Sequence, residues 1–414
     1  MRLLAAALLA LAALPATAGT AAASPQVLFG IQDDAWLEHG PGTLSSRVAR
    51  LDRLGVDVVR VTLHWHRIEQ APGRYDWARA DRLLQALRRR GIQPVATIWG
   101  TPAWANGELG PNVAPFEPEH AFRFARAAAG RYRFVTRWLV WNEPNKPLWL
   151  NPASPETYVA RILNPAYRGI KSANPRALVA GGVTAPRAGR DGVSPVDFLR
   201  RMDRAGAQLD VYAHHPYPVF PGDTPYRGGC RTCGTITMAS LDRLVRLVAH
   251  AFPRARIWLT EYAYQSRPPE PFGVSLAQQA RFIGEAARRV YLAPRVDMLV
   301  HYLYRDEPDL ARWQSGLETV AGRPKPALAA TALPLAQVAR RGSRTVVWGQ
   351  VRPGEGRQRY VLQRLAASRW VAIGPAARTS PRGYFVRTVT APKGAKLRVW
   401  YPAQRLASPP LVVR

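Results

Sequence analysis

The strongest constraint on the fold is a repeated alternation of short apolar runs and amphipathic segments between residues 26 and 336. In the first such segment, Leu44, Val48 and Leu51 fall on one helical face and Gly55 ends the pattern. Strands are expected at residues 27–31, 56–65, 93–99, 136–141, 177–182, 209–215, 256–262 and 296–304. Helices are expected at residues 44–55, 76–91, 117–131, 155–172, 195–205, 238–252, 276–291 and 326–335.

Eight strand–helix units in succession predict an α/β protein with a closed barrel. Near-continuous apolar strands that alternate with helices indicate a parallel sheet buried on both faces. Eight units over about 310 residues fit a (β/α)₈ TIM barrel better than an open doubly wound sheet. A phosphate-cradling glycine loop does not follow the first apolar run, which counts against a dinucleotide-binding fold.

The pattern changes after about residue 340, where short alternating apolar runs are separated by Gly and Pro. We therefore divide the mature chain into a catalytic barrel over residues 24–338 and a small C-terminal β-sandwich over residues 341–414. The second unit contains no obvious catalytic cluster. A scaffolding role is the favoured interpretation, with docking or polymer binding left open.

Residues 1–23 have the composition of a signal peptide. Arg2 supplies the positive start, LLAAALLALAAL the apolar middle, and either ATA (16–18) or AAA (21–23) the small-residue cleavage site. The apolar middle is too short to span a bilayer comfortably, and none of the remaining sequence approaches the length of a transmembrane helix. The sequence predicts a secreted, extracellular protein without an integral membrane segment.

The formal net charge of +30 arises from 58 basic residues, of which only five are Lys, and 28 acidic residues. The plain interpretation is an arginine-favouring coding bias spread over a solvated surface. The alternative is attraction to an anionic cell-wall polymer or a membrane surface. Nucleic acid is not an expected partner, because the sequence has neither a long basic block nor a recognised nucleic-acid-binding motif.

The two cysteines, Cys230 and Cys233, lie in the glycine-flanked sequence GGCRTCG. In an exported chain this spacing favours a small disulfide loop over a redox motif, and one pair is too few for a zinc site. The surrounding loop, residues 222–238, follows the sixth strand and is expected to overhang the barrel mouth.

Polar and aromatic residues collect where the predicted strands end, which is where (β/α)₈ barrels carry their active sites. Two of them stand out. Glu143 and Glu261 each end a strongly apolar strand, where an unpaired charge costs several kcal/mol unless solvent or partners compensate. The others each have a structural explanation as well, as barrel fillers or core side chains; they are Arg60, Trp99, Asn142, His215, Tyr217 and Tyr304.

Two facing carboxyl groups in an aromatic cleft are what glycoside hydrolysis requires. One carboxyl group is held protonated and donates its proton to the leaving oxygen, while the other stays ionised and attacks the anomeric carbon. Tryptophan rings provide flat apolar surfaces for the C–H faces of sugars, and polar groups at the rim bind the hydroxyls.

The sequences WNEPN (141–145) and WLTEY (258–262) resemble the signature of clan A retaining glycoside hydrolases, and the cellulase-like members of families 5 and 39 are the most similar in style. The resemblance extends over residues 26–336 and includes HPY (215–217) and GRPKPA (322–327). It implies that Glu143 is the general acid/base and that Glu261 is the nucleophile.

The same resemblance implies supporting roles for five further residues. Asn142 would hydrogen-bond the sugar 2-hydroxyl, Arg60 and Tyr217 would hold Glu261 ionised and oriented, His215 would support the same site, and Trp99 would line a sugar subsite. The sequence departs from the family pattern at the end of strand eight, which reads VHYLYRDEP and lacks the tryptophan platform. His301, Tyr302 or Tyr304 would take its place, and we assign Tyr304 to substrate binding.

The sequence therefore predicts a secreted retaining glycosidase that cleaves a poly- or oligosaccharide by double displacement, without a metal or organic cofactor. The alternative is a non-catalytic protein that binds carbohydrate or cell wall on a glycosidase scaffold. Asp33, Asp34 and Glu307 are further rim carboxylates and remain reserve candidates for catalysis.

Overall fold

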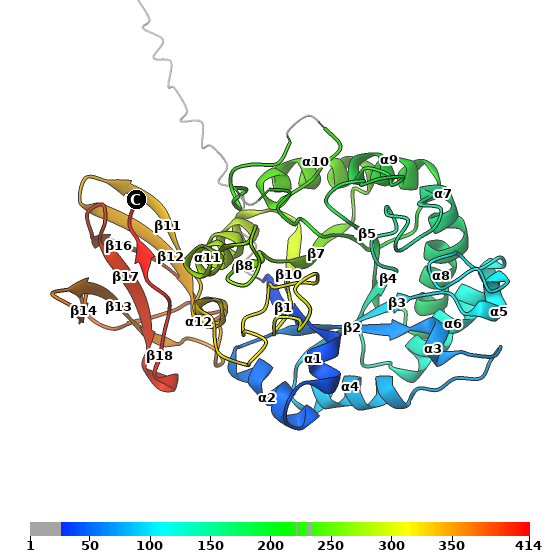
Figure 1. Cartoon of the computed structure of the whole chain (residues 1–414), viewed down its shortest axis with the longest axis horizontal. Coiled ribbons are helices and arrows are strands. Elements are labelled where there is room, and N and C mark those ends of the chain that lie inside the picture. The colour runs from blue at the N-terminus through cyan, green and yellow to red at the C-terminus, as the bar shows by residue number, and fades with distance from the viewer. Residues whose placement is uncertain (1–25, 221, 231–232) are drawn as a thin grey trace, which may run out of the picture.

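The computed structural model describes residues 26–220, 222–230 and 233–414, so the predicted signal peptide lies outside the described residues. Eight parallel strands close into a barrel in the order β1-β10-β7-β6-β5-β4-β3-β2 (Figure 1). These strands are β1 (Leu28–Gln32), β2 (Val58–His64), β3 (Gln93–Trp99), β4 (Arg137–Val140), β5 (Leu178–Thr184), β6 (Val211–His214), β7 (Arg256–Tyr262) and β10 (Val296–Tyr302). The predicted TIM barrel is confirmed.

Helices surround the barrel, as the apolar periodicity predicts (Figure 1). The long ones are α2 (Leu44–Arg53), α4 (Ala78–Arg89), α6 (Pro118–Arg131), α8 (Asn164–Ala173), α9 (Pro195–Arg204), α10 (Leu241–Ala251) and α11 (Leu276–Leu292), with α12 (Pro326–Ala332) after β10. Short helical segments are α1 (Asp34–His39), α3 (Trp65–Ile68), α5 (Ala103–Asn106), α7 (Pro155–Thr157), the π-helical η1 (Tyr158–Leu163) and the 3₁₀ turn η2 (Met238–Ser240). A small parallel pair, β8 (Ser266–Arg267) and β9 (Val274–Ser275), follows β7.

Strand β2 shows how the sequence directs a charged side chain into the barrel. Val59, Val61 and Leu63 pack in the core between the strands and the helices, whereas Val58 belongs to a separate cluster of buried strand residues. Successive side chains of a strand point to opposite faces. Arg60 therefore shares the inner face with Val58, and this places its guanidinium group inside the barrel.

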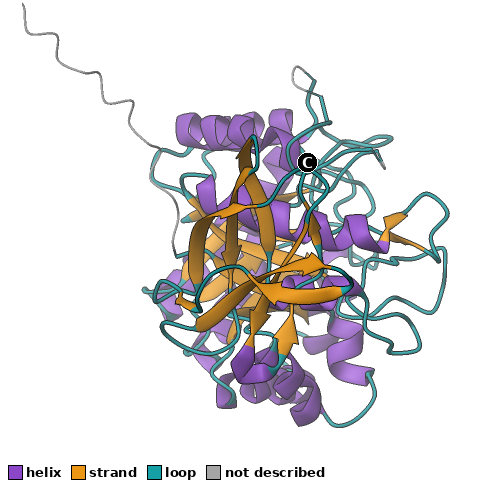
Figure 2. Cartoon of the chain, turned by 90° about the vertical axis from the view of Figure 1, so that its left-hand side faces the viewer, coloured by secondary structure: helices purple, strands orange, loops and turns teal. Residues whose placement is uncertain are grey.

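The C-terminal region forms two antiparallel sheets packed on each other, which lie toward the viewer in Figure 2. One sheet has the order β11-β12-β16, and the other has the order β14-β13-β17-β18, in which β15 also pairs with β13 and β19 with β17. Their bounds are β11 (Leu335–Arg341), β12 (Arg344–Gln350), β13 (Arg359–Ala366), β14 (Arg369–Ala372), β15 (Ala377–Arg378), β16 (Tyr384–Thr390), β17 (Lys396–Tyr401), β18 (Leu406–Ala407) and β19 (Leu411–Val412), with the 3₁₀ turn η3 (Pro402–Gln404) before β18. Tyr360 and Phe385 stack across the two sheets with ring centroids 4.1 Å apart.

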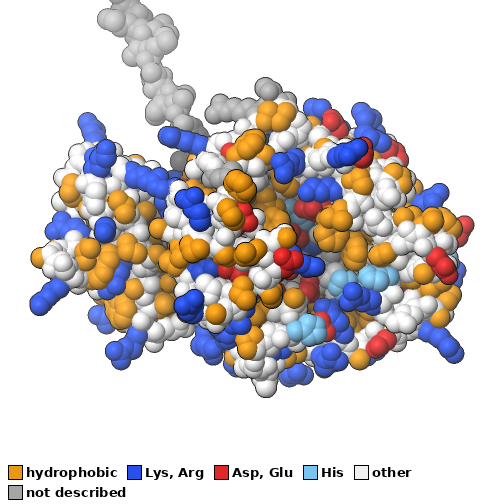
Figure 3. Space-filling view, viewed as in Figure 1, with side chains coloured by type: hydrophobic (Ala, Val, Ile, Leu, Met, Phe, Trp, Pro, Cys, Tyr) orange, Lys and Arg blue, Asp and Glu red, His pale blue; other side chains and the backbone are white. Residues whose placement is uncertain are grey.

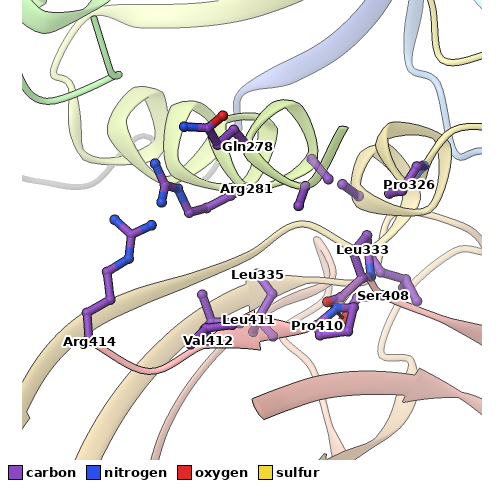
Figure 4. Close-up of a pocket in the computed structure, with 14 residues that line it drawn as sticks. Gln278, Arg281, Pro326, Leu333, Leu335, Ser408, Pro410, Leu411, Val412 and Arg414 are labelled. Carbon is purple, nitrogen blue, oxygen red and sulfur yellow. Dashed lines mark hydrogen bonds between the residues drawn. The ribbon is translucent and has the colours of Figure 1, made fainter. Parts of the chain in front are cut away.

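The C-terminal sheets pack against α11 and α12 of the barrel. Tyr291 of α11 contacts Trp348 and Tyr384, with ring centroids 5.5 Å and 4.7 Å apart. A mainly apolar cavity of about 240 Å³ lies between these helices and β19. Figure 4 shows Arg281 and Arg414 at one end of this cavity. The predicted division at residues 338–341 falls within β11, whose first residues already pack on the barrel helices.

Basic side chains are spread over the visible faces of both the barrel and the C-terminal sheets (Figure 3). Across the part of the chain that the structure describes, none of the helices combines the length and apolar character needed to cross a bilayer.

Candidate active site

A cleft of about 590 Å³ opens at the carboxyl ends of the barrel strands. Six of the predicted site residues line it, and His215 is completely buried in contact with three of them. The six are Arg60, Trp99, Asn142, Glu143, Tyr217 and Glu261. Because these residues come from five different strands or the loops that follow them, the closed barrel is what brings them together.

Glu143 lies where the chain leaves β4 in an unusual backbone conformation. Trp141 has φ = 77°, Glu143 has φ = 38°, and Val183 at the end of the neighbouring β5 has φ = 46°. Positive φ is uncommon outside glycine, is a clear outlier for a β-branched residue, and concentrates at functional sites. The Glu143 backbone N–H donates to the Val183 carbonyl over 2.9 Å, so the two strained turns support each other. This arrangement holds the Glu143 side chain at the cleft.

Glu261, near the end of β7, accepts hydrogen bonds through both carboxylate oxygens. Arg60 Nη1 donates to Glu261 Oε1 over 2.6 Å, and the Tyr217 hydroxyl donates to Oε2 over 3.0 Å. Burial raises the pKa of Tyr217 well above its ordinary value, which keeps this phenol protonated and a donor. A charge-assisted bond to arginine stabilises an ionised carboxylate. Glu261 is therefore held as a charged, oriented group.

Arg60 of β2 is only 1% exposed, and its guanidinium group contacts residues on or just after four other strands, β3, β4, β6 and β7. Its Nε donates to Thr97 Oγ1 over 2.9 Å, and Nη2 donates to Asn142 Oδ1 over 2.6 Å. Because Arg60 occupies Oδ1 of Asn142, the amide N–H groups of Asn142 are the part of this side chain left to donate to a ligand.

The buried His215 ring contacts both Glu143 and Glu261. Its Nε2 lies 3.2 Å from Arg60 Nη1, and its Nδ1 lies 3.0 Å from Glu143 Oε1 and 3.6 Å from Glu261 Oε2. Burial lowers the pKa of His215 to about 3, so the ring is neutral near pH 7. Since arginine only donates, Nε2 is the acceptor and the proton is on Nδ1. His215 Nδ1–H therefore donates to Glu143 Oε1.

The two carboxyl groups have different electrostatic surroundings. Burial raises the pKa of Glu143, and the nearby Lys146 and Arg60 offset part of this rise. Because Oε1 of Glu143 accepts from His215, a proton on Glu143 belongs on Oε2. Glu143 is thus suited to carry a proton, whereas Glu261 has a direct ion pair with arginine.

Glu143, His215 and Glu261 also form the one group of potential metal ligands found among the described residues, with one ligand atom of each within 4.8 Å of the others. Two fixed cations adjoin this group. Arg60 is paired with Glu261 at 2.6 Å, and Lys146 Nζ lies 3.5 Å from Glu143 Oε2. A divalent cation would meet repulsion from both, so the charges fit a pair of organic acid groups better than a metal centre.

Trp99 lines the cleft at the end of β3 and packs edge-to-face against Trp149, with ring centroids 5.4 Å apart. Within the described residues, the buried Trp99 Nε1 has no hydrogen-bond partner. The side chain therefore combines an apolar surface with a donor that a sugar hydroxyl can use.

The assignment of Tyr304 to substrate binding is not supported, because the structure places this side chain outside the cleft. Strand β10 ends at Tyr302, two residues earlier than expected, and Leu303 then turns the chain with φ = 80°. Tyr304 is 2% exposed and stacks on Trp36 with ring centroids 3.8 Å apart. Tyr302 and Trp313 line the cleft in its place, in edge-to-face contact at 5.5 Å.

Sequence reasoning missed the role of Lys146 and Asn145 in the segment WNEPNK. Lys146 lies three residues after Glu143 in a hydrogen-bonded turn and lines the cleft beside it. Asn145 is completely buried; its Oδ1 accepts from the Ala185 N–H and its Nδ2 donates to the Val193 carbonyl. It ties the loop after β4 to the loop after β5. Amide and charged side chains two and three residues after a predicted catalytic residue are the signal that would have found them.

The reserve carboxylates Asp33 and Asp34 line the cleft, but their oxygens are occupied. Asp33 accepts from the Trp36 N–H through Oδ1 and from the Tyr304 and Arg305 N–H groups through Oδ2. Asp34 accepts from the backbone and hydroxyl of Thr62. Both carboxylates therefore organise the loops around the cleft, whereas Glu143 and Glu261 face it.

The structure joins Cys230 and Cys233 in a disulfide, as expected. The loop was also expected to overhang the barrel mouth. Among its described residues none lines the cleft, and the contribution from this part of the chain ends at Pro218.

Comparison with known proteins finds solved structures of the same fold, whereas no family model and no curated protein sequence matches the chain. A family 39 glycoside hydrolase from Bacteroides cellulosilyticus WH2 is 17% identical, with a TM-score of 0.63 over 92% of this chain and 81% of its own. A monomeric β-xylosidase from Caulobacter crescentus CB15 is 18% identical, with a TM-score of 0.59 over 88% of this chain and 94% of its own. The family 39 enzyme from Xanthomonas axonopodis pv. citri is 17% identical, with a TM-score of 0.58 over 92% and 94% of the two chains.

At these identities the likeness establishes the fold. The chain shares the barrel with appended antiparallel sheets that is seen in family 39 and other clan A glycoside hydrolases, and the comparisons do not single out family 5.

Proposed function

We propose that this protein is a retaining glycoside hydrolase that cleaves O-glycosidic bonds of a poly- or oligosaccharide. The observation that carries the proposal is the juxtaposition of Glu143 and Glu261, which have carboxylate oxygens within 4.8 Å of each other at the mouth of a barrel. Retaining enzymes hold their two carboxyl groups about 5–5.5 Å apart, whereas inverting enzymes need about 6.5–9.5 Å to admit a water molecule. The short separation favours direct attack by a carboxylate.

In the first step, Glu261 attacks the anomeric carbon and forms a glycosyl ester, while Glu143 transfers its Oε2 proton to the departing glycosidic oxygen. Asn142 donates to the sugar 2-hydroxyl, an interaction that strengthens in the transition state. Arg60 and Tyr217 keep the attacking carboxylate oriented, so little reorganisation accompanies the reaction.

In the second step, Glu143 is ionised and removes a proton from a water molecule. The water attacks the same carbon, the ester bond to Glu261 breaks, and the sugar leaves with its original anomeric configuration. His215 remains neutral throughout, because burial disfavours its charged form. Its Nδ1–H bond to Glu143 Oε1 stabilises the carboxylate that forms when Glu143 gives up its proton in the first step.

A substrate of carbohydrate type is supported by the aromatic lining of the cleft. Trp99, Trp149, Tyr302 and Trp313 all line it. The solved structures of similar fold include a β-xylosidase and a glucosidase from Croceicoccus marinus, and the latter has a TM-score of 0.59 at 12% identity. These names support the class of substrate, a saccharide, without choosing the sugar.

The decisive test is covalent labelling. The protein is incubated with activated 2-deoxy-2-fluoro glycosides of glucose, xylose, mannose and galactose, and its peptides are analysed by mass spectrometry. We expect one of these sugars to label the peptide that contains Glu261. Labelling of another carboxylate would refute the assignment of the nucleophile. If none of the glycosides labels the protein and it also fails to release reducing ends from a polysaccharide panel, the non-catalytic binding protein becomes the better interpretation.

We also propose that the protein acts outside the cell after removal of the leader. The composition of residues 1–23 supports this proposal. Sequencing of the N-terminus of protein recovered from the culture medium should start after Ala18 or Ala23, and full-length protein retained in the cell would contradict it.

A further inference from the structure

A second groove of about 380 Å³ adjoins the catalytic cleft on the side of Glu143. It shares Lys146, Leu148 and Arg187 with the cleft. Its complete lining is Lys146, Pro147, Leu148, Arg187, Ala188, Gly189 and Arg190, which is three cations and no acid. The cleft itself contains five carboxylates, so the positive character belongs to this groove in particular.

The three cations have little to neutralise them. Arg190 has Asp191 at 3.7 Å, and both side chains are almost fully exposed, at 97% and 81%. Arg187 is exposed and lies in the loop that follows β5. Lys146 Nζ contacts Glu143 Oε2 at 3.5 Å with 30% of its side chain exposed. The groove therefore presents positive charge to whatever extends out of the cleft past Glu143.

We propose that Lys146, Arg187 and Arg190 form a subsite for an anionic substituent, a carboxylate or a sulfate, on the sugar that leaves with the proton of Glu143. The inference rests on the proposed glycosidase function, because the general acid defines which side of the scissile bond carries the leaving group. The substrate class is then an acidic polysaccharide rather than a neutral one.

The position of Lys146 links recognition to catalysis. Its cation opposes the rise in the pKa of Glu143 that burial produces, and this disfavours the protonated acid. An anion bound to Lys146 compensates that charge. An acidic leaving sugar thus favours the protonated form of Glu143 at the moment when a proton is required, and a neutral sugar does not.

The test uses two double variants that remove the same charge, both built on the inactive Glu261→Gln background so that the probe is not degraded. Arg187→Gln/Arg190→Gln alters the groove. Arg176→Gln/Arg254→Gln is the matched control, because both residues are exposed and precede β5 and β7 at the opposite end of the barrel. Affinity electrophoresis measures binding to hydroxyethyl cellulose, carboxymethyl cellulose and cellulose sulfate, which share one backbone and differ in charge.

We expect the groove variant to bind the anionic celluloses about tenfold more weakly than its parent, and the control variant to change by about twofold or less. A larger loss on carboxymethyl cellulose would identify a carboxylate site, and a larger loss on cellulose sulfate a sulfate site. Equal losses in the two double variants would overturn the proposal, since net charge alone would then explain binding.

An activity measurement separates this inference from the proposed function. Reducing ends are assayed with wild type, Glu143→Gln and Glu261→Gln on neutral and acidic polysaccharides. Equal product from all three proteins refutes the glycosidase. A wild type that cleaves neutral polymers as well as acidic ones refutes only the anionic subsite.

Discussion

Two buried clusters of this protein each contain a cation paired with a carboxylate, but their surroundings differ. Around Glu143 and Glu261, Arg60 and His215 contact the carboxylates from inside the barrel, while both carboxylates line an open cleft. Around Lys325, the Nζ group donates to Asp306 Oδ1 over 2.6 Å, to Ser266 Oγ over 2.8 Å and to the Gln314 carbonyl over 3.3 Å. This second cluster lies at the loops that follow β7 and β10, and its lysine is 3% exposed.

The difference shows that buried charge does not by itself indicate catalysis. All three donors of the Lys325 ammonium group are directed at protein acceptors, and the cluster lies buried away from the cleft, so this lysine has no donor left for a ligand. In the first cluster the protein partners occupy the inner sides of the carboxylates, and the remaining oxygen surface meets a cavity of sugar size. Lys325 belongs to the segment GRPKPA, so a residue of a family-like motif here has a structural role.

The largest effect is expected from Glu261→Gln. Loss of the nucleophile should lower turnover about 10⁴-fold or more, while the fold remains intact because glutamine keeps the shape and the acceptor oxygen. Release of reducing ends measures turnover, and circular dichroism with denaturant unfolding checks that the fold is intact. A variant that retains a tenth of the activity would show that the ionised carboxylate is not the nucleophile.

In contrast to Glu261→Gln, Lys325→Ala should lower the stability of the fold. Removal of the ammonium group leaves Asp306 buried without its cation, and we expect a loss of about 3–5 kcal/mol in the free energy of unfolding. Urea unfolding of purified protein measures the loss. The matched control is Lys325→Met/Asp306→Asn, which removes both charges and should recover most of the stability. A loss below about 1 kcal/mol for the single variant would mean that the pair contributes little.

A smaller stability change, of opposite sign, is expected for Glu143→Gln. Because burial raises the pKa of Glu143 in the folded state, the wild-type fold loses stability as pH rises from the unfolded-state pKa through the folded-state pKa. Glutamine removes that loss, so the variant should be about 1 kcal/mol more stable at pH 8 and show a smaller difference at pH 4. Equal stabilities at both pH values would contradict the raised pKa.

The smallest effect is a displacement of the pH profile by Lys146→Met. The lysine lowers the pKa of Glu143, and its removal should move the alkaline limb of kcat/KM toward higher pH on a neutral substrate. Profiles of wild type and variant on one substrate measure this shift, with Arg254→Gln as the control. A limb displaced toward lower pH would show that Lys146 does not act on the general acid through its charge.

Much of the architecture was predictable because local patterns carry it. Apolar runs of strand length and helical periodicity located all eight barrel strands, and the ends of those strands indicated Glu143 and Glu261. The exceptions have local causes. Tyr304 was misplaced because the positive φ of Leu303 turns the chain after Tyr302, and a leucine gives no sign of such a turn. Lys146 was overlooked because its proximity to Glu143 depends on the turn that follows β4.

The amino-acid sequence alone determined which side chains stand at the carboxyl ends of apolar strands, since strand length, hydrophobic pattern and Pro or Gly stops are encoded within a few residues. Only the tertiary structure decided which of those side chains meet. Arg60 and Glu261 are 201 residues apart in the chain and 2.6 Å apart in space. Barrel closure and the strained turns at Trp141, Glu143 and Val183 depend on contacts between distant strands, and those contacts set the distances on which the chemistry depends.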